Sequence, residues 1–396
     1  MSLKTVIIKP TKDKSIKRFH PWIFSGAIKS IDPGVNEGEI VDVYANKGKY
    51  LATGHYQDGS IAIRIFEFQQ QEIGAEYWKT KIQKAYNARK ELGLTNNKDT
   101  NIYRLVHAEG DGLPGLIIDY YNGTAVIQCH SIGMWLIKDI ISDQLKSIVP
   151  GIKAIYDKSA ETLAKKYIDF YAIKNQYLYG SDDAKFNGLE YGNKFSINWV
   201  TGQKTGFFVD QRENRKLLGS LSKGKKILNT FCYSGGFSIY ALNHGAKEVH
   251  SIDSSKKAIE LLEKNIELIN DYKGNHKSII ADAMNFIKEV DEDYDIIILD
   301  PPAFAKHMNA RHKAIQGYKR LNARAIEQIK PGGIIFTFSC SQVINKELFR
   351  NTLLSAGINS GRKIKILHQL HQPADHPVNI FHPESEYLKG LVIQVD

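Results

Sequence analysis

Apolar runs alternate with amphipathic segments from residue 225 to residue 395, and this alternation most constrains the fold. The runs predict strands, and the segments between them predict helices. Such a pattern is typical of an α/β fold in which a doubly wound sheet carries helices on both faces. The predicted strands are 226–231, 248–252, 278–281, 294–299, 334–339 and 390–395, and the predicted helices are 237–244, 255–270, 283–290, 312–329 and 346–356.

Three successive predicted strands end in residues that suit an adenosine-containing ligand. The first runs into Gly235 and Gly236, which allow a ligand to approach the backbone closely. The second ends at Asp253, 18 positions after Gly235, where a carboxylate can accept both ribose hydroxyls. The third ends at Asp282. The glycine spacing lacks the pyrophosphate cradle Gly-x-Gly-x-x-Gly, which favours S-adenosylmethionine over NAD.

The residues predicted to bind this cofactor stand at or beside the strand ends. They are Asn229, Phe231, Tyr233, Ser234, Gly235, Gly236, Asp253, Ser254, Asp282, Ala283, Asp300 and Pro301.

Two further strand ends carry a carboxylate and a thiol, Asp300 and Cys340. Open α/β sheets bind ligands at the carboxyl ends of their strands, so these groups are expected to face one crevice. A thiolate can add to carbon 6 of a pyrimidine so that carbon 5 can take a methyl group, and a neighbouring acid can serve N3. We predict Cys340 as nucleophile and Asp300 as its acid partner. The alternative is a thiol packed beneath the sheet.

Two other functions remain open. Asp300-Pro301-Pro302 followed by Phe304 could bind an exocyclic base amine, whose methylation needs no cysteine. The chain could also be a non-catalytic RNA-binding or ribosome-assembly protein. The glycine turn, Asp253 and Asp300 weigh against that alternative.

The first 93 residues follow a different pattern. Between residues 5 and 68, short alternating segments separated by turn signals predict a small β-barrel. Residues 76–92 carry apolar side chains at helical spacing and predict a helix that Gly93 closes.

Residues 101–179 predict a separate α+β module. The glycine-rich turn 109–115 within it is interpreted as structural, because no Lys-Ser/Thr follows the glycines. Cys129 is expected to be a packed thiol. The predicted elements are strands 116–120 and 124–129 and a helix at 135–148.

The formal net charge is +10, which suits a polyanionic partner. Near the N-terminus, basic residues stand beside aromatic ones, a combination used for phosphate contact and base stacking. A solvated loop whose Trp22 and Phe24 anchor it in a core is an equally weighted alternative. The predicted RNA contacts in this segment are Lys14, Lys17, Arg18, His20 and Trp22.

No apolar stretch approaches the ~18–20 residues of a membrane span, and the N-terminus lacks an apolar signal core. A cytoplasmic location without membrane partners is therefore expected. The three cysteines are widely spaced, which suggests neither disulfides nor a zinc cluster. No metal is predicted either for the late histidines, which have no adjacent cysteine or carboxylate set. These are His368, His371, His376 and His382.

The glycine turn, Asp253 and Asp300-Pro301-Pro302 together resemble class I S-adenosylmethionine-dependent methyltransferases. Six segments more closely resemble the bacterial large-subunit (23S) ribosomal RNA cytosine-C5 methyltransferases that carry an N-terminal PUA domain. Those segments are 20–26, 205–212, 300–302, 339–341, 374–378 and 386–390. The resemblance runs through nearly the whole chain.

This resemblance implies a PUA barrel at 1–72, a central α+β domain at 73–180 and a Rossmann-like methyltransferase domain at 181–396. It implies S-adenosyl-L-methionine as cofactor and ribosomal RNA as partner, with a homodimer as a possible assembly.

The resemblance also implies roles for single residues. Phe208, Asp210 and Gln211 are expected to contact the cofactor. Arg212 is expected to pair with RNA phosphate or with an acidic neighbour, and His376 is expected in a substrate-side loop that contacts RNA. Family members often have Lys after Asp-Pro-Pro, where this chain has Ala303, so no catalytic lysine is assigned.

Overall fold

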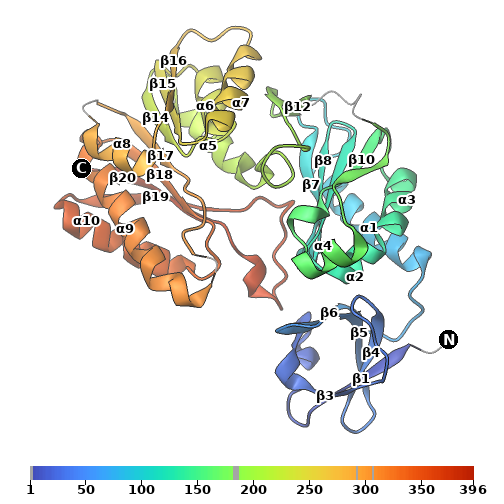
Figure 1. The fold of residues 1–396 in the computed structure, drawn as a ribbon. Coiled ribbons are helices and arrows are strands. Elements are labelled where there is room, and N and C mark those ends of the chain that lie inside the picture. The colour runs from blue at the N-terminus through green and yellow to red at the C-terminus, as the bar shows by residue number, and fades with distance from the viewer. Residues whose placement is uncertain (1–2, 182–186, 291–292, 306) are drawn as a thin grey trace. The chain divides into compact units, whose positions relative to one another are not determined.

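The computed structural model describes residues 3–181, 187–290, 293–305 and 307–396 (Figure 1). Packing divides the chain into two compact units. Unit 1 comprises Met1–Gly188, Ile197–Val209 and Ala374–Ser385, and unit 2 comprises Leu189–Ser196, Asp210–Pro373 and Glu386–Asp396. The division into three domains with boundaries after residues 72 and 180 stays a prediction.

Unit 1 begins with a small six-stranded β domain, as predicted. Its strands lie in the order β2-β6-β5-β4-β1-β3, and β1 and β4 are parallel neighbours. Val6, Ile8, Val41 and Val43 are fully buried at alternate positions, because successive side chains of a strand point to opposite faces. The strands are β1 (Lys4–Ile8), β2 (Trp22–Phe24), β3 (Ile28–Ile31), β4 (Ile40–Ala45), β5 (Tyr50–Tyr56) and β6 (Ile61–Glu67).

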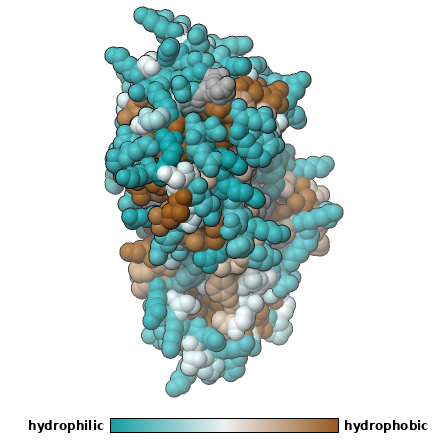
Figure 2. All heavy atoms as spheres, turned by 90° about the vertical axis from the view of Figure 1, so that its left-hand side faces the viewer, coloured by the Kyte–Doolittle hydropathy of each residue, from teal (hydrophilic) through white to brown (hydrophobic). Residues whose placement is uncertain are grey.

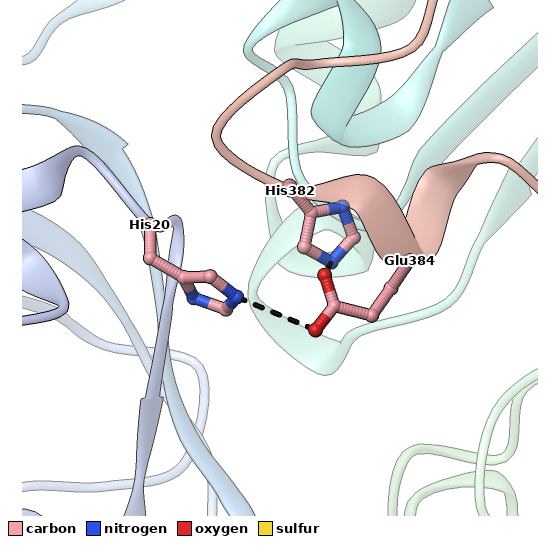
Figure 3. Close-up of side chains that lie close together, drawn as sticks. All are labelled: His20, His382 and Glu384. Carbon is pink, nitrogen blue, oxygen red and sulfur yellow. Dashed lines mark ion pairs between the residues drawn. The ribbon is translucent and has the colours of Figure 1, made fainter.

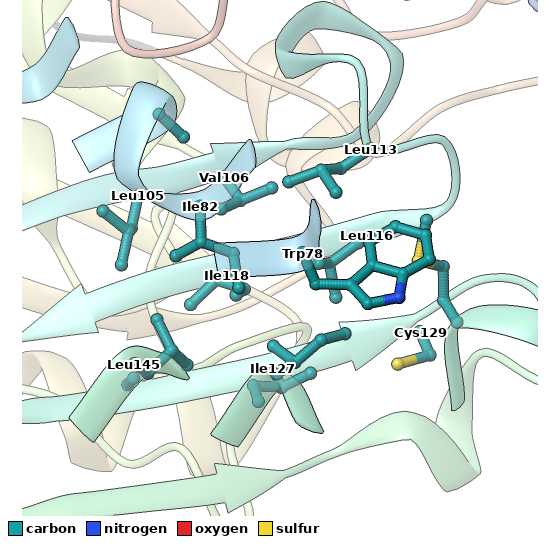
Figure 4. Close-up of a cluster of buried hydrophobic side chains, with 14 of the residues drawn as sticks. Trp78, Ile82, Leu105, Val106, Leu113, Leu116, Ile118, Ile127, Cys129 and Leu145 are labelled. Carbon is teal, nitrogen blue, oxygen red and sulfur yellow. The ribbon is translucent and has the colours of Figure 1, made fainter. Parts of the chain in front are cut away.

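A second sheet of unit 1 has the order β11-β10-β9-β8-β7. Trp78 of α1 and Leu145 of α3 belong to one apolar cluster with Ile118 and Ile127 of the sheet (Figure 4). Cys129 lies in this cluster with no exposed surface, which confirms it as a packed thiol. The elements are α1 (Ala75–Glu91), β7 (Ile102–His107), β8 (Leu116–Tyr121), β9 (Thr124–Cys129), α2 (Ile132–Leu136), α3 (Lys138–Ile148), β10 (Ala154–Asp157), α4 (Lys165–Tyr171) and β11 (Gln176–Tyr179).

The predicted helix end and the glycine-rich turn are both observed. Gly93 follows α1 with a φ of 68°, the left-handed conformation that glycine adopts at helix ends. In the turn, Asp111 forms two hydrogen bonds with the buried Arg89, at 2.6 and 2.7 Å. The turn therefore holds unit 1 together, in agreement with a structural role.

Unit 2 is built on a seven-stranded sheet with the order β16-β15-β14-β17-β18-β20-β19. The first five of these strands run parallel, and β20 runs antiparallel to both β18 and β19. The strands are β14 (Lys226–Thr230), β15 (Glu248–Asp253), β16 (Asn275–Ile280), β17 (Ile296–Leu299), β18 (Ile334–Ser339), β19 (Ile364–His371) and β20 (Lys389–Val395).

Helices pack on both faces of this sheet, as the alternating pattern predicts. Along the central strand β17, Ile297 and Leu299 join a cluster with α9 and α10, whereas Ile296 and Ile298 join a cluster with α5 and α6. The helices are α5 (Arg212–Leu221), α6 (Gly236–Asn243), α7 (Lys256–Glu267), α8 (Ala283–Phe286), α9 (Arg311–Gln328) and α10 (Lys346–Ser360), and a hairpin of β12 (Asn187–Glu190) and β13 (Asn193–Ser196) precedes them.

One strand of the seven-stranded sheet is absent from the sequence prediction. β19 pairs along its length with β20 at the edge of the sheet, yet most of its residues are exposed. It lacks the buried apolar run by which the other strands were recognised. His368 and His371 of the late histidine group belong to this strand.

Within the described residues, no helix is long and apolar enough to cross a membrane. Hydrophilic side chains cover much of the face seen in Figure 2, with apolar side chains scattered among them.

Candidate active site and cofactor site

The turn between β14 and α6 has an unusual backbone conformation. Phe231, Tyr233 and Gly235 have positive φ angles of 54°, 45° and 79°. For side chains as large as Phe and Tyr this left-handed conformation costs about 1–3 kcal/mol each and persists only where the surroundings fix it. Asp253 helps to fix it, because Oδ2 accepts a hydrogen bond from the Tyr233 backbone N–H at 3.0 Å. Strain of this kind is concentrated at ligand sites.

Two carboxylates stand where the sequence predicts them, at the carboxyl ends of neighbouring strands. Asp253 ends β15, and its Oδ1 accepts from the Ser255 backbone at 2.9 Å. Asp282 follows β16 and caps α8, with Oδ1 accepting from the Asn285 backbone at 2.9 Å. Ser254 and Asp282 are exposed, whereas Ala283 is buried.

Two buried side-chain oxygen atoms of predicted cofactor residues in unit 2 lack a hydrogen-bond donor among the described residues. They are Oδ1 of Asp210 and Oδ1 of Asn229. The other polar atoms of the two side chains are used: Asp210 Oδ2 accepts from the Tyr387 hydroxyl at 2.7 Å, and Asn229 Nδ2 donates to Ser238 Oγ at 2.8 Å. A buried acceptor without a donor is unfavourable, so both oxygens suit a ligand that brings donors.

Asp300 follows β17, and Gln211 Nε2 donates to its Oδ2 at 3.1 Å. Burial raises the pKa of the Asp300 carboxyl to about 7, and the charge of Asp210 acts in the same direction. The hydrogen bond from Gln211 opposes this rise. Asp300 can therefore hold and release a proton near neutral pH.

Cys340 follows β18, the strand next to β17. It is partly exposed, whereas Cys129 and Cys232 are buried. Burial raises the pKa of the Cys340 thiol to about 12, and the charges of Asp300 and Asp210 contribute to this rise. Asp300 and Cys340 follow neighbouring strands, as the sequence predicts, and their roles stay a prediction.

Lys389 also belongs to this site, although the sequence analysis gave it no role. It begins β20 opposite Ser339, and its Nζ donates to the Ser341 carbonyl at 2.7 Å. Its charge lowers the pKa of Cys340 against the effect of burial.

Comparison with known proteins identifies the family. The pattern of PUA-like domains matches residues 6–68, and that of S-adenosylmethionine-dependent methyltransferases matches residues 158–385. A relative from Tolumonas auensis, named ribosomal RNA large subunit methyltransferase I, is 38% identical over 98% of this chain and 99% of its own. The chain belongs to the S-adenosylmethionine-dependent methyltransferases.

Further relatives agree over the full length. The protein of the same name from Aeromonas hydrophila is 35% identical over 100% of both chains. Two solved structures share the fold: a protein from Streptococcus mutans described as a SAM-dependent methyltransferase (TM-score 0.83, 24% identity) and a methyltransferase in complex with SAH (TM-score 0.84, 23% identity). Each covers 99% of this chain and 100% of its own.

The methyltransferase site fits its cofactor by chemistry. S-adenosylmethionine carries hydrogen-bond donors on its ammonium group, its ribose and its adenine. The site supplies acceptors on Asp210, Asn229, Asp253 and Asp282, two of which include a buried oxygen without a donor. Which acceptor meets which group stays a prediction. Phe208 belongs to unit 1, and its role stays a prediction too.

The N-terminal RNA candidates occupy different environments. Lys14, Lys17 and Arg18 are exposed, and Lys17 pairs with Asp13 at 2.5 Å. The Trp22 ring nitrogen donates to Glu109 Oε1 at 2.8 Å, so this side chain is anchored within unit 1. The exposed cations thus support an RNA contact, whereas the anchored indole of Trp22 supports the alternative of a loop fixed in a core.

Two other RNA candidates are buried. Arg212 is 2% exposed and pairs with Glu213 at 3.3 Å, which favours the acidic-neighbour alternative. His376 is 1% exposed and lies 3.1 Å from Asp375 Oδ1. Neither side chain is available at the surface in this structure, and an RNA contact for either stays a prediction.

A cluster of His20, His382 and Glu384 is shown in Figure 3. Glu384 Oε1 lies 3.6 Å from His20 Nε2, and Glu384 Oε2 lies 3.7 Å from His382 Nε2. Three such groups within 4.8 Å of one another could hold a metal ion, but one carboxylate between two imidazoles also forms an ion-pair cluster unaided. His20 is 364 positions from Glu384, so sequence spacing gave no sign of it. The absence of a metal stays a prediction.

Proposed function

We propose that this methyltransferase modifies carbon 5 of a cytosine in large-subunit ribosomal RNA, with Cys340 as covalent nucleophile. The names of the relatives support the RNA class, as does the match to a PUA-like domain. The observation that carries the cytosine-C5 assignment is the position of Asp300 and Cys340 directly after β17 and β18, two parallel neighbouring strands whose carboxyl ends share one edge of the sheet. A protein acting on ribosomal RNA works where ribosomes are, so the cytoplasm is its proposed location.

Asp300 is suited to the acid role. A carboxyl group with an ordinary pKa is ionised at neutral pH and cannot donate a proton. Because the pKa of Asp300 is raised to about 7, a large fraction carries its proton at neutral pH. When the Cys340 thiolate forms a bond to carbon 6, the C5–C6 double bond opens and Asp300 donates its proton to N3.

The remaining steps restore the thiolate. S-adenosylmethionine supplies an electrophilic methyl group when bound. After carbon 5 has taken the methyl group, a base removes the proton from that carbon. The C6–S bond then breaks, the C5–C6 double bond re-forms, and N3 returns its proton to Asp300. The electron pair of the broken sulfur–methyl bond would stay on S-adenosylhomocysteine, and the carbon 5 proton leaves through the base to solvent.

The environment of Phe304 disfavours methylation of an exocyclic amine. That alternative uses the aromatic residue after Asp-Pro-Pro to stack on the base. Here the Phe304 ring packs on Tyr318 with the centroids 4.6 Å apart, and it is partly buried against the cluster that includes α9. A ring already packed in this way offers less surface to a base.

The test is covalent trapping on RNA that carries 5-fluorocytosine. Fluorine cannot leave carbon 5 as a proton, so the enzyme should transfer one methyl group and remain attached to the RNA. Cys340→Ala should form no adduct. Cys129→Ala and Cys232→Ala are matched controls that should still form it, because both thiols are buried.

Ribosomal RNA from a strain lacking this protein provides the unmethylated substrate for a methylation assay. Bisulfite sequencing should show one lost methylcytosine in the large-subunit RNA. Full methylation by Cys340→Ala would exclude the covalent route and favour the amine-directed alternative.

A further inference from the structure

Lys389 is held beside Cys340 by two backbone contacts. It pairs across the sheet with Ser339, the last residue of β18, and its Nζ donates to the Ser341 carbonyl at 2.7 Å. The lysine therefore contacts the chain on both sides of Cys340. The side chain of Lys389 is buried, with the residue 5% exposed.

The charge of this lysine has no carboxylate partner within ion-pair distance in the part of the chain that the structure describes. Lys158, which has no exposed surface, differs in this respect because Glu161 lies 3.6 Å from its Nζ. Burial lowers the pKa of Lys389 to about 8, while the charges of Cys340 and Glu386 oppose that change and Lys346 adds to it. A buried ammonium is unfavourable unless an anion stands beside it.

The Cys340 thiolate needs a positive charge nearby, just as the buried ammonium group needs a negative one. Apart from burial, the groups that raise its pKa are Asp300 and Asp210, and Lys389 is the cation that lowers it. Burial raises the pKa of the Tyr318 hydroxyl in α9, and the charge of Cys340 adds to this rise. The nucleophile is the thiolate, not the thiol, so a thiol among carboxylates needs both a proton acceptor and a positive charge nearby.

We propose that Lys389 is the positioning residue that makes Cys340 nucleophilic, because its buried ammonium group stabilises the thiolate by its charge. The thiol proton leaves to solvent, the electron pair of the S–H bond stays on sulfur, and the lysine keeps its own proton throughout. When the sulfur leaves carbon 6 at the end of the cycle, the thiolate returns to the same environment. The inference rests on the proposed function for its purpose, but the lysine charge acts on the thiol without RNA.

The test measures the reactivity of Cys340 in the full-length protein without RNA. Iodoacetamide alkylation is followed at pH 7.5 and pH 9 by mass spectrometry of the peptide that contains Cys340. Below its pKa the thiol reacts in proportion to its thiolate fraction, so alkylation should be at least tenfold slower in Lys389→Met than in wild type at either pH. Lys389→Arg keeps the positive charge and should stay close to the wild-type rate.

Two further variants separate charge from structure. Lys389→Gln retains a donor for the Ser341 carbonyl but has no charge, and it should behave like Lys389→Met. It also serves if the Met variant does not fold. Lys346→Met removes an exposed charge that pairs with Glu386 at 2.5 Å and should leave the alkylation rate of Cys340 within about twofold of wild type.

Wild-type reactivity of Cys340 in folded Lys389→Gln would overturn the proposal. It would mean that a hydrogen bond to the Ser341 carbonyl is sufficient and that the charge of Lys389 has no effect on the thiol. The trapping assay distinguishes the two proposals. If wild-type protein forms no adduct on 5-fluorocytosine RNA while Lys389→Gln still slows the alkylation of Cys340, the cytosine-C5 function fails and the effect of the Lys389 charge on the thiol stands.

Discussion

Asp300→Asn should make unit 2 more stable at pH 8 while abolishing turnover. Burial and Asp210 raise the pKa of Asp300 from 3.8 to about 7 in the folded protein. At 1.36 kcal/mol per pKa unit, this increase corresponds to an upper limit of about 4 kcal/mol. Because the folded state holds the proton more tightly, the stabilisation is fully present below pH 3.8 and is lost as pH rises through 7. Asparagine avoids that loss because it has no charge to bury, and it cannot protonate N3.

The assay is urea unfolding followed by far-UV circular dichroism at several pH values from 4 to 8.5. All four tryptophans lie in unit 1, so their fluorescence reports the other unit and serves as an internal comparison. The advantage of Asp300→Asn should reach about 1–4 kcal/mol at pH 8 and shrink towards pH 4.

Asp295→Asn is the matched control with the opposite sign. Hydrogen bonds from the Lys226 backbone and from Lys330 outweigh burial and lower the pKa of Asp295. Its charge therefore stabilises the fold above the unfolded-state pKa, and this contribution disappears as pH falls. The Asn variant should be less stable than wild type at pH 8. An Asp300→Asn protein that is also less stable at pH 8, by an amount independent of pH, would refute the assigned charge environment.

Three other outcomes are expected. Asp253→Ala should weaken S-adenosylmethionine binding by roughly 1.5–3 kcal/mol in calorimetry, which is the contribution of hydrogen bonds to a charged acceptor. The variant Asp271→Ala, at an exposed position, should not weaken it. Equal affinity of Asp253→Ala and wild type for the cofactor would remove Asp253 from the site. The double variant Lys14→Ala, Arg18→Ala should reduce the slope of log RNA affinity against log salt concentration by about 0.7–0.9 per lost phosphate contact. The control double variant Lys47→Ala, Lys49→Ala, whose lysines are exposed in the same β domain, should leave that slope intact. If both pairs change the slope alike, the segment has no special role. Glu190→Gln removes the carboxylate charge that now accepts from the buried Arg215 at 2.7 and 2.8 Å, and it should lower the free energy of unfolding in urea by about 3–5 kcal/mol. Glu327→Gln removes the carboxylate of an exposed ion pair and is the comparison. An equally small effect of both variants would contradict the burial argument.

Local sequence pattern was sufficient for elements with a buried face. The parallel strands of unit 2 and the helix closed by Gly93 were predicted because their apolar spacing follows the geometry of strand and helix. β19 was not, since most of its side chains are exposed and its pairing with β20 is visible only in the folded chain. Lys389 was overlooked for a related reason: a lysine ordinarily stands at the surface, and only the sheet register brings it to Cys340.

The residues of the candidate site were likewise predictable only in part from local sequence. Asp300 and Cys340 could be found because strand ends in an open sheet share one edge. The buried state of Arg212 and His376 could not be found, because it depends on which distant segments cover them. Neither the donor-free oxygen of Asp210 nor the cluster of His20 and Glu384 has any local signature.

Unit 1 consists of three separate stretches of chain, and this has a consequence for its evolution and for fragment experiments. The stretch Ala374–Ser385 belongs to unit 1 although most of the neighbouring sequence belongs to unit 2. Within it, the Asp375 carboxylate accepts from the Arg104 backbone at 2.9 Å, and the Asp375 carbonyl accepts from Arg89 at 2.7 Å. A fragment that stops before residue 374 would leave the buried Arg89 with fewer acceptors. Neither unit is one contiguous stretch of sequence, so recombination could not exchange either unit as a single segment, and the two units are expected to be inherited together.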